Sequence, residues 1–122
     1  MTDANDKTIE INRGDRKTIV LKNKSGTFKV GDNIKFSVVE KKNYNNVLFQ
    51  KTYTVTRRSK YMPITLSRED MKIGDVISKK LVCWYEIEYN GSQTIVGYDD
   101  DGGKEFILYP EAPDKGGNDN EL

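Results

Sequence analysis

The feature that most constrains this chain is the alternation of side chains between Lys80 and Tyr89. Alternate positions form two sets, of which one is Cys83, Tyr85, Ile87 and Tyr89 and the other is Val82, Trp84, Glu86 and Glu88. Successive side chains of a β-strand point to opposite faces, so this period of two predicts a strand whose later part is apolar on one face and acidic on the other. Asn90-Gly91 follows directly and predicts a type I′ hairpin turn, because both central residues of that turn need a positive φ.

Shorter runs of the same kind recur along the chain, separated by Gly, Asp and Asn. The other segments with strand character are residues 7–12, 16–22, 33–41, 47–56, 61–66, 92–98 and 104–109. Alanine occurs only twice, whereas aromatic residues make up 10% of the chain. Short strands at regular spacing predict an all-β fold, which we expect to be an immunoglobulin-like β-sandwich of about seven or eight antiparallel strands.

Three local features refine this expectation. Lys51 falls on the apolar face of the 47–56 strand, which predicts either a position at the margin of the sheet or a β-bulge that shifts the alternation. Pro63 cannot donate a ladder hydrogen bond, so the 61–66 strand is expected at a sheet edge. Ser67 followed by the acidic Asp70 is typical of an N-terminal cap and predicts one helical turn near residues 67–72, with Met71 pointing inward.

A length of 122 residues is that of one domain. We expect residues 1–6 to be a polar N-terminal arm, residues 7–110 the sandwich, and residues 111–122 a polar acidic C-terminal tail. The N-terminus has neither the basic nor the apolar region of a secretion signal, and no window is long and apolar enough to span a membrane. We therefore expect a protein that is made and used in solution, with no membrane partner.

The sequence contains no histidine and only one cysteine, Cys83. These residues cannot assemble a histidine-based triad, a Cys-His dyad or a zinc site built from His and Cys. Cys83 cannot close an intramolecular disulfide, and we interpret it as a small buried apolar residue. We expect no enzymatic activity, no catalytic or metal-binding residue and no cofactor.

Three polar motifs have both a functional and a structural interpretation. Arg13-Gly14-Asp15 matches the tripeptide that integrins bind, but we favour a turn between two strands, like the Gly-Asp steps at residues 31–32 and 74–75. Asp99–Asp101 offers oxygen ligands for calcium without the spacing of an EF-hand loop, so a solvated hairpin tip is favoured and an ion site stays open. Glu86 and Glu88 share a strand face, but paired acid and base catalysis by carboxylates needs a deep cleft.

Charge is distributed unevenly although the net charge is +1. Counting Lys, Arg, Asp and Glu gives +11 for residues 7–80, −8 for residues 81–122 and −2 for residues 1–6. One interpretation is a phosphate-binding patch with tyrosines as stacking partners for bases, made of Lys41, Lys42, Arg57, Arg58 and Lys60 with Tyr44, Tyr53 and Tyr61. We favour solvated hairpin ends and no nucleic-acid partner, because nucleic-acid binders usually have a basic total as well. A bipolar surface that meets its own copies or a charged lattice is a third interpretation.

Several segments together resemble a known group of proteins. They are INRGDRKTIVL, FKVGDNIKFSVVEKKN, ITLSREDMKIGDVISK and CWYEIEYNGSQTIVGYDDDGGKEFILYPEA. The series is similar to small structural proteins of tailed phages and prophages of Gram-positive, chiefly clostridial, bacteria, over roughly residues 8 to 112. The N-terminal modules of phage baseplate upper proteins share a similar opening. The resemblance implies an immunoglobulin-like sandwich without enzymatic activity, located in a virion assembled in the host cytoplasm.

Within such a virion, a capsid decoration protein on the outer head shell is favoured, because the chain has no second domain and no heptad-patterned segment. A tail or baseplate adaptor is the alternative, and a module that binds carbohydrate or a host surface is an alternative of another class. The expected partners are the major capsid protein or other virion proteins, in many copies. The candidate interface residues are Lys41, Lys42, Arg57, Arg58, Lys60, Trp84, Pro113 and Leu122. Trp84 would be a contact residue if it pointed outward and a core residue if it did not.

Overall fold

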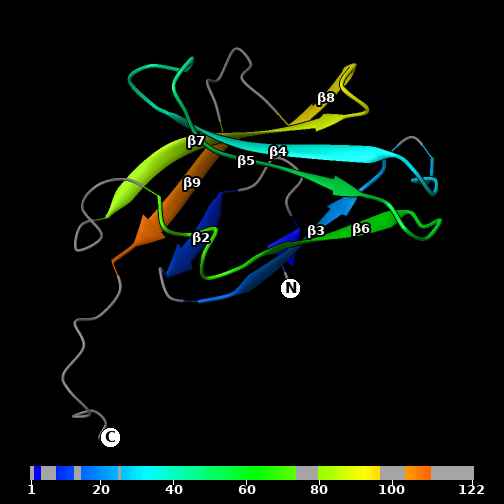
Figure 1. The fold of residues 1–122 in the computed structure, drawn as a ribbon, viewed down its shortest axis with the longest axis horizontal. Coiled ribbons are helices and arrows are strands. Elements are labelled where there is room, and N and C mark those ends of the chain that lie inside the picture. The colour runs from blue at the N-terminus through cyan, green and yellow to red at the C-terminus, as the bar shows by residue number, and fades with distance from the viewer. Residues whose placement is uncertain are drawn as a thin grey trace, which may run out of the picture.

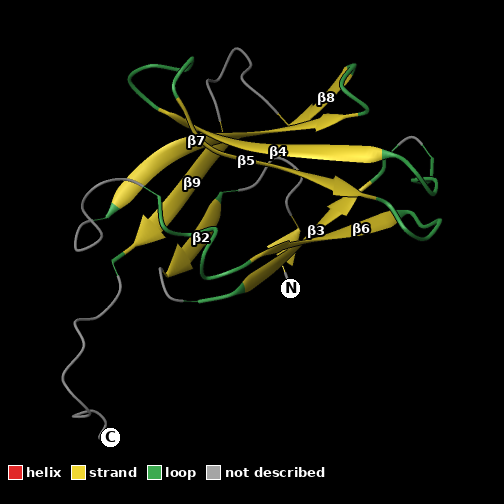
Figure 2. Ribbon diagram, in the orientation of Figure 1, coloured by secondary structure: helices red, strands yellow, loops and turns green. Residues whose placement is uncertain are grey.

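The computed structural model describes residues 2–3, 8–12, 15–24, 26–73, 80–96 and 104–110. Two layers of β-sheet face each other, and the described residues contain no helix (Figures 1 and 2). The strands are β1 (Thr2–Asp3), β2 (Ile9–Asn12), β3 (Lys17–Lys22), β4 (Asn33–Glu40), β5 (Val47–Thr54), β6 (Tyr61–Leu66), β7 (Leu81–Tyr89), β8 (Gln93–Val96) and β9 (Lys104–Tyr109). The prediction of an all-β sandwich is confirmed.

The larger sheet has the order β2-β9-β7-β4-β5, with β8 also paired to β7, and the smaller sheet has the order β1-β3-β6. Most neighbours are antiparallel, as expected, but β2 runs parallel to β9 and β1 runs parallel to β3. The expectation of a wholly antiparallel fold was therefore wrong. The chain crosses from the larger sheet at β2 to the smaller sheet at β3, and the local patterns of the sequence do not show which sheet receives each strand.

The core lies between the two sheets and is built from the inward positions of both. Its buried members are Ile9, Ile11, Ile19, Leu21, Phe28, Ile34, Phe36, Val38, Val55, Ile64, Leu66, Met71, Ile73, Cys83, Tyr85, Ile87, Phe106 and Leu108. Phe36 is central, because its ring stacks on Tyr85 at 5.7 Å between centroids and meets Phe106 edge-on at 5.9 Å. Cys83 is buried as predicted.

Strand β5 is an edge of the larger sheet, and this position explains Lys51. Lys51 lies opposite the buried Phe36, but its ammonium group reaches outward to Asp70 at 3.3 Å. The prediction of a marginal position is confirmed. A β-bulge is also present in this strand pair, between Val38 and Val39 and therefore away from Lys51. Strand β6, with Pro63, is an edge of the smaller sheet, as predicted.

The expected helical turn near residues 67–72 is a hydrogen-bonded turn that does not continue into a helix. The Ser67 backbone N–H donates to Asp70 Oδ2 at 2.9 Å, and the Asp70 N–H donates to Ser67 Oγ at 3.2 Å, so the capping pair forms as predicted. Met71 is buried, but so is Ile73 two residues later. A spacing of two between buried side chains fits an extended chain at this point.

Two turns form where glycine in the sequence predicts them. Asn90 and Gly91 have φ values of 52° and 69°, as a type I′ turn between β7 and β8 requires. Gly31 has a φ of 95°, and the neighbouring Asp32 accepts a hydrogen bond from the Lys29 N–H at 2.8 Å. The interpretation of Gly31-Asp32 as a turn signal is therefore confirmed, whereas Gly74-Asp75 lies outside the described residues.

Candidate interaction surfaces

Trp84 lies on the outer face of the larger sheet, away from the core. Its neighbours along β7, Cys83 and Tyr85, are both buried, whereas Trp84 is only half-buried. Lys41 places its ammonium nitrogen 4.2 Å from the centroid of the Trp84 ring and 2.5 Å from a carboxylate oxygen of Glu105. Of the two positions that the sequence left open for Trp84, the structure shows the outward one.

The β4–β5 hairpin loop brings further residues to the same place. Tyr44 donates a 3.0 Å hydrogen bond from its hydroxyl group to Glu86 Oε2 on β7. The surface here forms a shallow depression of about 400 Å³, lined by Lys41, Lys42, Tyr44 and Trp84. The fold therefore unites two predicted interface lysines with the predicted tryptophan, although these residues are far apart in the sequence.

A band of apolar side chains continues from Trp84 across the outer face. Val82 on β7 and Ile107 on β9 are directly opposite each other, and both are half-buried. Tyr109, two residues further along β9, has the ammonium nitrogen of Lys80 5.5 Å from its ring centroid. Val82, Trp84, Ile107 and Tyr109 are called the outer-face band below. The sequence pattern showed that Val82 and Trp84 share a face, but Ile107 and Tyr109 join them only through the pairing of β7 with β9.

Acidic side chains border the outer-face band and are each held by a separate partner. Glu10 accepts a short hydrogen bond from the Tyr109 hydroxyl, and this bond raises the pKa of Tyr109 above its ordinary value. Glu88 pairs with Lys35 at 2.9 Å, whereas Glu86 accepts from Tyr44. Glu86 and Glu88 thus share a face, as the alternation predicts, and each is engaged with a different partner.

Arg57, Arg58 and Lys60 lie at the opposite end of the sandwich from Lys41 and Lys42. The two groups are at the two ends of the β4–β5 hairpin, and Figure 1 shows these ends on the left and on the right. Eight residues of β4 separate them, which corresponds to roughly 25 Å of strand. The five basic residues that the phosphate-binding interpretation would combine therefore lie on two separate surfaces.

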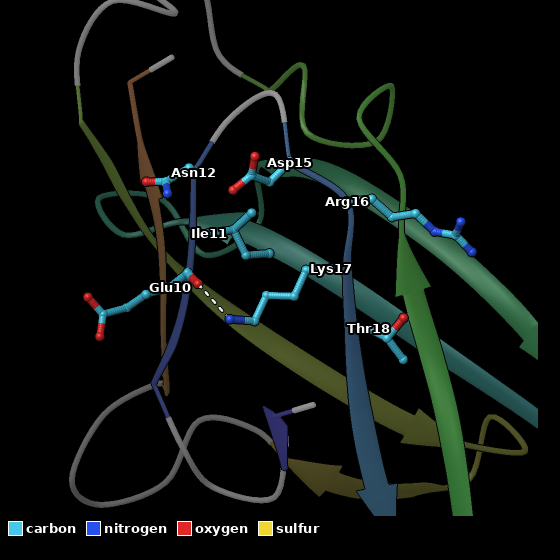
Figure 3. Close-up of a pocket in the computed structure, with 7 residues that line it drawn as sticks. All are labelled: Glu10, Ile11, Asn12, Asp15, Arg16, Lys17 and Thr18. Carbon is cyan, nitrogen blue, oxygen red and sulfur yellow. Dashed lines mark hydrogen bonds between the residues drawn. The ribbon is translucent and has the colours of Figure 1, made fainter. Parts of the chain in front are cut away.

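A third surface lies where β2 connects to β3. A hollow of about 480 Å³ lies here, and Figure 3 shows the residues that line it, which are Glu10, Ile11, Asn12, Asp15, Arg16, Lys17 and Thr18. Lys17 donates from its ammonium group to the Glu10 carbonyl oxygen at 3.1 Å, whereas the Arg16 side chain points away from the hollow. The charged groups do not converge on one point. Arg13 and Gly14 lie outside the described residues, and Asp15 is exposed.

Other predicted features lie in parts of the chain that the structure does not describe. They are Pro113, Leu122 and the Asp99–Asp101 turn. Within the described residues there is no group of three or more His, Cys, Asp or Glu side chains placed to hold a metal ion. In the same part of the chain, no helix has the length and apolar character that would be needed to cross a membrane.

Comparison of the chain with protein-family models, with curated proteins and with solved structures found no match.

Proposed function

We propose that this chain is a non-enzymatic structural protein of a tailed phage particle, which decorates the outer head shell through the outer-face band. Support comes first from the resemblance of its sequence to small virion proteins. Support also comes from the strand order, because β9-β7-β4-β5 in one sheet and β3-β6 in the other correspond to the G-F-C-C′ and B-E arrangement of an immunoglobulin-like sandwich.

The observation that carries the proposal is the outward Trp84 within an apolar band bordered by charge. Protein interfaces are rich in Trp and Tyr at their centres and have polar rims. The outer face has this composition, with Trp84 and Tyr109 in the band and Lys41, Glu105 and Glu10 around it. A sheet face of this kind fits a flat protein surface better than it fits a small ligand.

The mechanism is adhesion without a chemical step. A contact on one face of a single sandwich is small, so each copy contributes a modest binding free energy. A shell presents many identical sites, and the free energies contributed by all bound copies add up to stabilise it. The core between the sheets keeps the binding face rigid, because Phe36 and its neighbours are held by ring contacts from three strands.

The test is binding of the purified full-length chain to phage heads that lack it, followed by the temperature at which the heads rupture. We expect saturable binding, a raised rupture temperature, and at least about tenfold weaker binding for Trp84→Ala, as for a central interface residue. Thr52→Ala is the matched control, because Thr52 is an exposed residue of β5. Binding to purified tails or baseplates, with none to heads, would instead support the adaptor alternative.

A second candidate function is carbohydrate or host-surface binding, which the depression beside Trp84 favours. Trp84 and Tyr44 offer aromatic rings there, and Lys41 and Lys42 offer hydrogen-bond donors. This is the combination of apolar surface and polar groups that small-ligand sites use. A glycan array with the full chain and with Trp84→Ala tests it. Binding that Trp84→Ala abolishes would support this function over decoration.

A further inference from the structure

The end of the sandwich opposite the β4–β5 hairpin loop carries a dense group of positive charges. Two segments, residues 22–32 and 55–61, contribute Lys22, Lys24, Lys29, Arg57, Arg58 and Lys60, which are called the cationic end below. All six are exposed except Lys22, which is half-buried. Arg57, Arg58 and Lys60 were already candidate interface residues from the sequence, and the pairing of β3 with β6 brings the first segment beside them.

Backbone hydrogen bonds hold the two segments together and so fix these charges in place. Phe28 and Ser59 exchange two bonds, at 2.7 and 3.2 Å, and the Asn23 N–H donates to the Lys60 carbonyl at 2.8 Å. Gly31 and Val55 are joined by a further bond at 2.9 Å. An ordered backbone loses little further backbone entropy on binding, which favours its use as an interface.

Asp32 is the only acidic residue in these two segments, and its carboxylate accepts hydrogen bonds from nearby residues. The hydroxyl of Tyr89, the Lys29 N–H and the Asn90 side chain donate hydrogen bonds to its carboxylate. The bond from Tyr89 is the main cause that lowers the pKa of Asp32 below 3.8. Counted over these two segments alone, the six cations and one carboxylate give a net charge of +5.

The cationic end also has a hollow and exposed apolar groups. The hollow measures about 410 Å³ and is lined by Thr56, Arg57, Ser59, Tyr61, Met62 and Pro63. Tyr61 is 51% exposed, and Val30 nearby in the first segment is 68% exposed. A ligand for this surface should combine negative charge with small apolar groups such as proline. An acidic peptide has this chemistry.

The chain itself contains such a peptide. Residues 111–122 include Glu111, Asp114, Asp119 and Glu121, with one lysine and with Pro113. This segment follows β9, which runs parallel to β4 because both are antiparallel to β7. Strand β9 therefore ends at the end of the sandwich that is opposite the cationic end, as Figure 1 shows.

We propose that the cationic end of one copy binds the acidic segment 111–122 of a second copy. To bind the cationic end of its own chain, the segment would have to reverse direction and run the length of the sandwich. That distance is roughly 25 Å, and the fully extended segment spans roughly 40 Å, so little of it would remain to make the contact. Nucleic acid is disfavoured as the occupant, because residues 81–122 carry a charge of −8 that repels a polyanion. The contact joins two different surfaces, so it continues from copy to copy as a chain or a closed ring.

The contact is independent of the proposed function, because it requires only copies of this chain. The test is sedimentation velocity of the full chain over a range of concentrations at low ionic strength. We expect the weight-average mass to rise with concentration and this rise to disappear at high salt, since charge pairs at a surface are screened. A monomer at every concentration would overturn the proposal and would leave head binding to its own test.

Two neutralised variants locate the contact. One carries Arg57→Gln, Arg58→Gln and Lys60→Gln, and the other carries Glu111→Gln, Asp114→Asn, Asp119→Asn and Glu121→Gln. Each variant alone should stay monomeric. Their mixture should form a one-to-one dimer and nothing larger, because it contains one functional cationic end and one functional acidic segment. Failure of the mixture to dimerise would overturn binding between copies.

A control variant removes as much positive charge from elsewhere, by Lys42→Gln, Arg68→Gln and Lys72→Gln. It should associate as the parent chain does. Loss of association in this control would show that only net charge matters, which would overturn the specific contact. A short single-stranded DNA gives the last comparison. If the DNA binds tightly at the cationic end and self-association continues unchanged, the cationic end is not the contact between copies, and the proposal is overturned.

Discussion

The hydroxyl group of Tyr53 donates a 3.0 Å hydrogen bond to the backbone carbonyl oxygen of Thr65. Tyr53 belongs to the edge strand β5 of the larger sheet and Thr65 to the edge strand β6 of the smaller sheet, so this bond joins the two layers. Burial raises the pKa of Tyr53 well above its ordinary value, and the negative charge of Asp70 adds to the effect. Tyr53 therefore stays a protonated donor throughout the pH range of a folded protein.

Replacement of Tyr53 by phenylalanine should destabilise the fold by about 1 kcal/mol, because it leaves the Thr65 carbonyl without its partner. Urea unfolding followed by tryptophan fluorescence measures this change. Tyr44→Phe is the matched control, since its hydroxyl bonds to Glu86 on the outer face, where water can replace it. An equal loss from both substitutions would contradict the assigned role of the Tyr53 bond.

Asp70 makes the stability of the fold depend on pH. Burial raises its pKa, but hydrogen bonds from the Ser67 N–H, the Lys51 ammonium group and the Ser67 hydroxyl outweigh burial and hold it below 3.8. A carboxyl group whose pKa is lower in the folded state stabilises the fold above the pKa of its unfolded state, and this stabilisation is lost as the pH falls through the folded value.

Asp70→Asn should therefore cost about 1 kcal/mol at neutral pH, as the loss of a capping residue does, and the difference from the parent should shrink below about pH 4. Urea unfolding at a series of pH values measures it. Glu69→Gln is the control, because Glu69 is 80% exposed and pairs with Lys72 within the same turn. A difference that stays constant down to acid pH would argue against the carboxylate as the cause.

Gly91→Ala should destabilise the β7–β8 hairpin by about 1 to 2 kcal/mol, because its φ of 69° lies in the left-handed region that disfavours a Cβ atom. Among the described residues, no heavy atom beyond Gly91 and its two chain neighbours lies within 4 Å of the position of that Cβ, so the substitution tests backbone strain. Gly26→Ala is the control, since Gly26 has the same open surroundings without a positive φ. Thermal unfolding of both variants should separate them clearly, and equal melting temperatures would refute the turn assignment.

Trp84→Ala should cost far less stability than Phe36→Ala, although tryptophan is the larger residue. Phe36 is fully buried between the sheets, and its truncation is expected to cost about 3 to 5 kcal/mol. Trp84 lies on the outer face, where its contact with Lys41 contributes about 1 kcal/mol or less. Calorimetry compares the two variants. A loss of stability for Trp84→Ala as large as that for Phe36→Ala would show that Trp84 is part of the core.

Deletion of Pro113 to Leu122 should leave the melting temperature nearly unchanged, because the buried core of the described residues lies between Ile9 and Leu108. The same deletion should weaken association with the particle. Calorimetry and co-sedimentation with heads measure the two effects on one protein. Equal binding by the shortened chain would show that residues 113–122 do not contribute to particle binding.

The alternation of side chains and the local turn motifs of the sequence determined most strands and turns of this protein. The alternation at Cys83, Tyr85 and Ile87, the Asn90-Gly91 turn, the edge position of Pro63 and the capping pair of Ser67 with Asp70 are all local effects. Each depends on residues within a few positions of one another, so the backbone geometry of a strand or turn suffices to predict it. The outward or inward direction of Trp84 was not predictable in this way, because both faces of that strand carry apolar groups.

Only the tertiary structure decided which strands became neighbours. The parallel pairing of β2 with β9, the assembly of the outer-face band from β7 and β9, and the division of the basic residues between two ends of the sandwich all join residues far apart in the chain. Such contacts are chosen by the packing of complete sheets around Phe36 and Phe106, and this packing depends on the whole set of side chains at once. A period of two gives the face on which a residue lies but gives no information about its partner across the ladder.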